Sequence, residues 1–118
     1  MDYNRRMTTW KNELKTEFKM AQDALDVKNY GKMRVCARRA AGISIREYLL
    51  ARGITPPSVS AYDLLKFLDE MDDTSADIRQ ASAYLRLRVT EEFRLPVDVD
   101  LVAEAQKICS TLTPDWEK

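Results

Sequence analysis

Basic side chains are the residues of this sequence whose type and spacing could do chemistry. Residues 28–53 contain seven lysines and arginines and only one acidic residue. Within this run Arg34 and Arg38 are four positions apart, and Arg39 and Arg46 are seven apart, so each pair falls on one face of a helix. Guanidinium groups suit bidentate contacts with phosphate or carboxylate. We therefore expect this run to be the main candidate surface for an anion or a nucleic acid.

A second group of arginines follows later in the chain. Arg79 and Arg86 are again seven positions apart, with Arg88 and Arg94 beyond them. These side chains could instead pair with nearby acids or with a dimer partner, and the sequence leaves both explanations open. The acids available for such pairing are Asp69, Asp72, Asp77 and Glu91. The candidate ligand or partner surface comprises Arg38, Arg39, Arg46, Arg86, Arg88 and Arg94.

Other kinds of site find little support. The chain has no histidine, which removes the commonest general base near neutral pH and the usual nitrogen ligand of metals. Its cysteines, Cys36 and Cys109, are far apart, and its glycines form no phosphate loop. The adjacent acids at 72–73 and 91–92 point in different directions on a helix. We predict that the protein is not an enzyme and binds no metal or cofactor.

Length and composition favour one helical domain. The 118 residues suffice for a single core, and we assign residues 1–118 to one domain. Glycine and proline are scarce, which favours an all-α fold. Net charge is zero, yet residues 1–52 hold twelve basic and six acidic side chains, whereas residues 53–118 hold seven and thirteen. This asymmetry predicts either a bipolar surface or basic helices docked on acidic ones.

No signal peptide or membrane span is evident, so we predict a soluble, cytoplasmic protein that does not bind membranes. Nothing in the sequence indicates recognition of a DNA sequence.

The spacing of the apolar residues predicts the helices that carry these arginines. It predicts an up-and-down antiparallel bundle of four main helices plus one short helix. The main helices are expected over about 4–28, 30–52, 75–93 and 101–112, and the short helix over about 61–69. The helix over 30–52 is apolar on several sides, which indicates a central position. Caps are expected at Ser60, at Ser75, and at Asp98 or Asp100, and the tail from Thr113 is expected to fray.

The apolar stripes also predict the core. Cys36 and Cys109 lie on apolar positions and are expected to be small buried hydrophobes rather than a disulfide. The other predicted core residues are Trp10, Leu14, Phe18, Leu25, Ala40, Ile43, Leu64, Leu68, Leu85, Val89, Leu101, Ala105 and Ile108.

The order of these features resembles the HEPN domain, the nucleotide-binding domain named for higher eukaryotes and prokaryotes. The similar segments are AQDAL at 21–25 before a tyrosine-containing turn, AAGISIREYLL at 40–50, YDLLKFL at 62–68, and the Arg-Leu-Pro turn at 94–96. The resemblance covers about residues 10–112. It implies a helical homodimer, similar to the partners of minimal nucleotidyltransferases in toxin–antitoxin loci.

The departures from this family bear on activity. Gly42 stands where the family often has Glu, and Tyr62 where it often has His. Ribonuclease members carry an Arg followed after four to six residues by His, whereas Arg88 is followed at that distance by Phe93. The resemblance therefore implies a member without ribonuclease activity.

Three functional hypotheses follow. The first is a non-catalytic HEPN-like homodimer that binds a protein partner, such as a small nucleotidyltransferase, or a nucleotide. The second is a protein that binds RNA, or cleaves it without a metal, using arginine and tyrosine. The third is a helical adaptor unrelated to nucleotides.

Overall fold

The computed structural model describes residues 2–88 and 99–118, with side chains from Thr9 onward. Its helices are α1 (Asp2–Asp26), α2 (Tyr30–Ala51), α3 (Ala61–Glu70), α4 (Ala76–Leu85) and α5 (Leu101–Leu112). No strand occurs in the described ranges. The predicted all-α bundle is confirmed. It differs in detail, because α4 has ten residues and is as short as α3.

Local capping explains where most of these helices begin. The side chains of Asn29, Ser60, Ser75 and Asp100 each accept a hydrogen bond from the backbone N–H three residues later. Such a cap satisfies one of the N–H groups that a helix start leaves without a partner. The predicted caps at Ser60 and Ser75 are confirmed, and Asp100 caps α5. The alternative cap, Asp98, lies outside the described residues.

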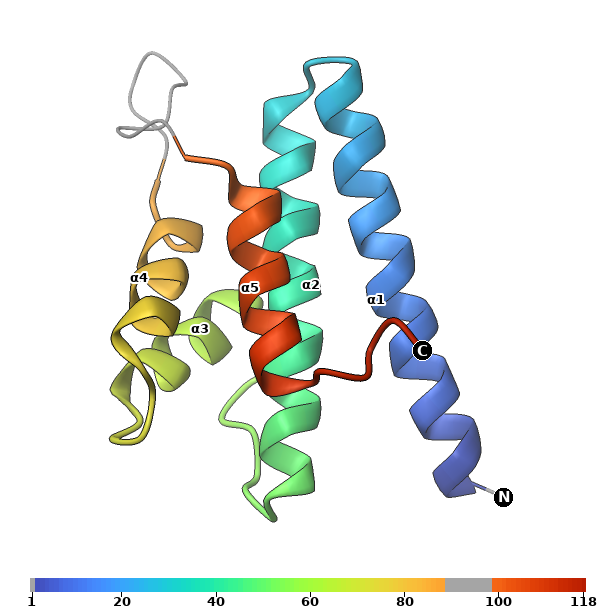
Figure 1. Cartoon of the computed structure of the whole chain (residues 1–118), viewed down its shortest axis with the longest axis vertical. Coiled ribbons are helices and arrows are strands. Elements are labelled where there is room, and N and C mark those ends of the chain that lie inside the picture. Colours follow the sequence, from blue (N-terminus) through green and yellow to red (C-terminus); the bar gives the residue numbers. More distant parts are fainter. Residues whose placement is uncertain (1, 89–98) are drawn as a thin grey trace.

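Helix α2 lies at the centre of the bundle, as predicted from the apolar residues on several of its sides. It packs against α1, α3, α4 and α5. Figure 1 shows α1 antiparallel to α2, and α4 antiparallel to α5, while α5 lies beside α2 and runs in the same direction. Three large hydrophobic residues of α2, Tyr30, Val35 and Leu50, are nonetheless exposed. They leave apolar surface on a helix that is otherwise well covered.

The predicted core is largely confirmed. Leu25 and Ile43 are only half-buried and pack against its edge, and Val89 lies outside the described residues. The buried members are Trp10, Leu14, Phe18, Ala40, Leu64, Leu68, Leu85, Leu101, Ala105 and Ile108.

Both cysteines are buried and free, as predicted. The Cys109 thiol donates to the Ala40 carbonyl oxygen at 3.7 Å, and burial raises the pKa of Cys109 to about 12. Burial, followed by the neighbouring Glu17 carboxylate, also raises the pKa of Cys36. Since the thiolate is the reactive form, both act as packing residues.

The prediction that the fourth helix extends to Phe93 is wrong in its described part, because α4 ends at Leu85. The Arg38 guanidinium on α2 donates to the carbonyl oxygens of Leu85 and Leu87, the second at 2.6 Å. In a longer helix these carbonyls would accept from amides four residues later. Arg38 supplies the alternative donor and so helps to end the helix. Residues 89–93 lie outside the described part.

The end of α1 also differs from the prediction. The helix stops at Asp26 rather than near Lys28, because Lys28 adopts a left-handed conformation with φ of 62°. A residue in this region commonly terminates a helix.

The prediction that the tail frays is wrong. Trp116 is 6% exposed, and its ring lies 5.0 Å from that of Phe18 on α1. The Thr113 hydroxyl hydrogen-bonds the buried Ser44 hydroxyl at 2.7 Å, and Lys11 pairs with Asp115 at 3.3 Å. Figure 1 shows the tail crossing from α5 to α1. Burial of a large aromatic side chain offsets the entropy lost when the tail is ordered.

Candidate functional site

A groove of about 430 Å³ lies between α2 and the start of α3, with α1 along one side. We call it the α2–α3 groove. Its charged lining residues are Glu17, Arg38, Arg39 and Arg46, and the rest of the lining is Val35, Gly42, Ile43, Val59, Ala61 and Leu64. The groove therefore combines an aliphatic surface with three guanidinium groups.

The spacing along α2 explains why its residues meet here. From Val35 to Arg46 the lining positions follow each other at intervals of three or four, or are adjacent, which keeps them on one face of the helix. The eleven steps from Val35 to Arg46 rise by about 16 Å along the helix axis, so this wall is long. Three of the six candidate arginines thus line a common groove.

Gly42 lets α3 approach α2 at the floor of the groove. A Cβ atom built on Gly42 would lie 3.0 Å from the Ala61 Cβ and 3.2 Å from its Cα. Any larger side chain would have to displace the first turn of α3. The departure from the HEPN pattern at Gly42 therefore has a packing reason in this chain.

Arg38 ties the groove to the end of α4 through the two carbonyl contacts described above. Burial, and after it the positive charge of Arg34, lowers the pKa of Arg38. An arginine remains protonated in spite of such a shift. Its charge adds to the positive potential of the groove, while two of its donors already serve the structure.

The other two arginines are more available. Arg39 is exposed and makes no ion pair or hydrogen bond with any residue that the structure describes. Arg46 donates through Nε to Glu47 at 3.0 Å, and its Nη2 lies 3.7 Å from a Glu13 oxygen. Its side chain is still 36% exposed, so part of the guanidinium can meet a ligand.

Glu17 contributes a negative charge on the α1 side of the groove. Its Oε2 atom is buried and has no hydrogen-bond partner among the described residues. An unpaired carboxylate oxygen next to the groove disfavours an anion at this end. The groove is therefore most favourable to an anion along its α2 edge, where Arg39 and Arg46 lie.

The remaining candidate arginines do not line the groove. Arg86 pairs with Asp69 on α3 at 2.8 Å, one of the pairings that the sequence allowed. Arg88 is exposed and is absent from the groove lining. Arg94 lies outside the described residues.

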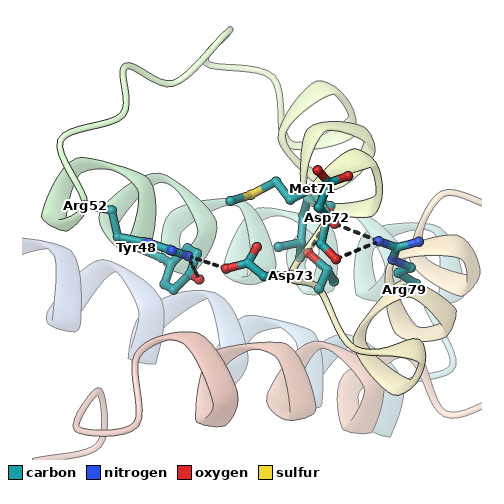
Figure 2. A network of polar contacts seen from close by, with 8 residues as sticks. Tyr48, Arg52, Met71, Asp72, Asp73 and Arg79 are labelled. Atoms are coloured by element: carbon teal, nitrogen blue, oxygen red, sulfur yellow. Dashed lines mark hydrogen bonds and ion pairs between the residues drawn. The ribbon is translucent and has the colours of Figure 1, made fainter.

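An ion pair and a backbone contact account for two other basic residues. Figure 2 shows Arg52 between Tyr48 and Asp73, and its Nη1 lies 3.0 Å from the Asp73 carboxylate. In the same view Arg79 donates to the carbonyl oxygen of Met71 at 2.7 Å. The charge asymmetry of the sequence thus has two outcomes, ion pairs such as Arg52–Asp73 and Arg86–Asp69 and an arginine-lined groove.

The aliphatic part of the groove was not anticipated from the sequence. Val59 is 99% exposed in the loop before α3, and Val35 is 42% exposed on α2. Val59 belongs to no periodic stripe, so no helical pattern could reveal it.

Comparison with known proteins does not assign the chain to a family. No protein-family model, no curated protein and no solved structure matches this chain. The HEPN resemblance therefore remains a prediction.

In the part of the chain that the structure describes, no group of three or more cysteine or acidic side chains is placed to hold a metal ion. No helix in the described ranges is both long and apolar enough to cross a membrane.

Gly42→Val tests how the groove is built. The new side chain would collide with Ala61, and we expect the free energy of unfolding to fall by about 1–3 kcal/mol. Gly31→Val is the control, because nothing lies within 4 Å of its Cβ position and α2 has only begun there. Urea denaturation followed by circular dichroism measures both. Equal stability of the two variants would contradict the close α2–α3 contact.

Proposed function

We propose that this protein is a non-catalytic helical binding module whose α2–α3 groove holds an acidic, amphipathic segment of a protein partner. The observation that supports it is the meeting of Arg38, Arg39 and Arg46 with aliphatic side chains in one groove. Partner helices commonly lay an apolar face in such a groove, while charges at the rim select the sequence.

The lining favours a protein segment over a nucleotide or RNA. Bases bind proteins largely by stacking on aromatic rings, and the groove lining contains no aromatic residue. Its long wall on α2 also suits an extended helical ligand more than a compact one. Nucleotide or RNA binding is accordingly the alternative that the experiment below must separate.

The HEPN resemblance makes a small nucleotidyltransferase one source of the acidic segment. It also implies a homodimer, which would be an assembly of two 13.6 kDa chains. Light scattering at micromolar concentration, at low and high salt, measures this directly. A monomer mass under both conditions would exclude the dimer without affecting the groove.

The proposed function is tested by NMR titration of the ¹⁵N-labelled protein. An acidic amphipathic helical peptide should shift the amide signals of groove residues, including Arg39, Gly42 and Ala61. A peptide of the same length with lysine in place of each acid should not. Arg39→Glu should weaken binding by about tenfold or more, since it replaces an attraction by a repulsion.

Arg88→Glu is the matched control, because Arg88 is an exposed arginine outside the groove lining. It changes net charge equally and should leave binding within about twofold. Equal losses in the two variants would indicate non-specific attraction. Salt-dependent binding of a uridine oligonucleotide, without peptide binding, would support the RNA hypothesis instead.

A further inference from the structure

The groove geometry points to a particular arrangement of charges in its ligand, and this inference rests on the proposed function. We propose that the bound segment is a helix with two acidic residues seven positions apart and an aliphatic residue between them. The acids would meet Arg39 and Arg46, and the aliphatic side chain would pack against the aliphatic lining of the groove.

The spacing follows from helix geometry. Arg39 and Arg46 are seven residues apart on α2, which is about 10.5 Å along the axis and nearly two full turns. A partner helix packed along α2 has the same rise per residue. Its side chains seven positions apart therefore match the two guanidinium groups. A crossing angle of about 20° displaces one end by only about 4 Å, which long arginine side chains can follow.

The middle of the groove selects an apolar side chain. Gly42 lies between the two arginines in sequence, and α3 closes the space above it, with the Ala61 Cβ 3.0 Å from where a Gly42 Cβ would stand. The aliphatic side chains that line the groove around this contact are Val35, Ile43, Val59 and Leu64. An aliphatic residue three or four positions after the first acid would pack against them, as ridges pack against grooves in neighbouring helices.

The state of each arginine explains why these two define the spacing. Arg39 makes no ion pair or hydrogen bond within the described residues, so a carboxylate can bind it without displacing any of them. Arg46 keeps its 3.0 Å contact from Nε to Glu47, while the 3.7 Å contact of its Nη2 with Glu13 is one that a closer carboxylate can replace. Arg38 is less suited, since its Nε and Nη2 hold the carbonyl oxygens of Leu85 and Leu87.

The experiment compares labelled helical peptides of about 18 residues by fluorescence anisotropy. Two have the same composition and a central leucine, one with glutamates seven positions apart and one with glutamates five apart. The five-residue spacing puts the second acid on another face of the helix. We expect the seven-residue spacing to bind about tenfold more tightly.

A charge swap identifies the arginine that each acid meets. Arg39→Glu should weaken binding of the seven-residue peptide by about tenfold or more. Replacing one of its two glutamates by lysine should restore binding to this variant, whereas replacing the other should not. Since Arg39 is exposed, the variant should keep its fold, and circular dichroism checks this. Arg88→Glu should show neither the loss nor the rescue.

Each outcome decides between the two proposals. Equal affinity for both spacings, with groove signals shifted in each case, would overturn the charge arrangement and leave the proposed function standing. Rescue by both lysine peptides alike would also overturn it. Absence of groove shifts with every peptide would overturn the proposed function itself.

Discussion

Leu85→Ala is expected to lower the free energy of unfolding by about 2–5 kcal/mol. Leu85 is fully buried at the end of α4, where its own carbonyl oxygen accepts from Arg38. Truncation removes buried apolar surface and leaves a cavity that the surrounding helices can fill only in part. Urea denaturation monitored by circular dichroism measures the loss.

Leu50→Ala makes the same chemical change at an exposed position of α2, where the side chain is 39% exposed. We expect a loss of about 0.5 kcal/mol or less there, because little of the side chain leaves a packed environment. Similar losses in the two variants would contradict the position of α4 in the bundle.

Trp116→Ala is expected to destabilise the protein by about 3–5 kcal/mol. The indole is buried against Phe18, and its removal would expose part of α1 and release the end of the tail. The loss should appear both in thermal unfolding and in faster hydrogen exchange of residues 113–118.

Tyr30→Ala is the matched control for this substitution. Tyr30 is an aromatic residue at the start of α2 and is 53% exposed, so its truncation should cost little. A loss below about 1 kcal/mol for Trp116→Ala would mean that the tail frays, as its position at the end of the sequence had suggested.

Elements defined by local signals were predictable. The start of α2 and both ends of α5 agree with the predicted boundaries, and Ser60 and Ser75 cap the helices that they were expected to cap. These features depend on side chains within a few residues of each other. A capping oxygen three positions before its N–H donor, or an apolar stripe at helical spacing, can therefore be recognised from the sequence alone.

The candidate site was predictable only in part. Arg38, Arg39 and Arg46 are on one helix, so their shared face follows from spacing alone. Arg86 forms an ion pair with Asp69. The sequence had left open whether this arginine pairs with an acid or belongs to a ligand surface. The aliphatic side of the groove depends on Val59, whose loop position relative to α2 no local pattern specifies.

By itself, the sequence determined an all-α fold with α2 at its centre and a chain without histidine chemistry. Only the tertiary structure decided where α4 ends, because its terminal carbonyl contacts Arg38, 47 positions earlier. It also decided that the tail is ordered, since Thr113 contacts Ser44 across 69 positions. The periodicity of apolar residues and the capping residues reflect interactions between neighbours in the sequence. The end of α4 and the order of the tail depend instead on contacts that form only once distant helices have packed.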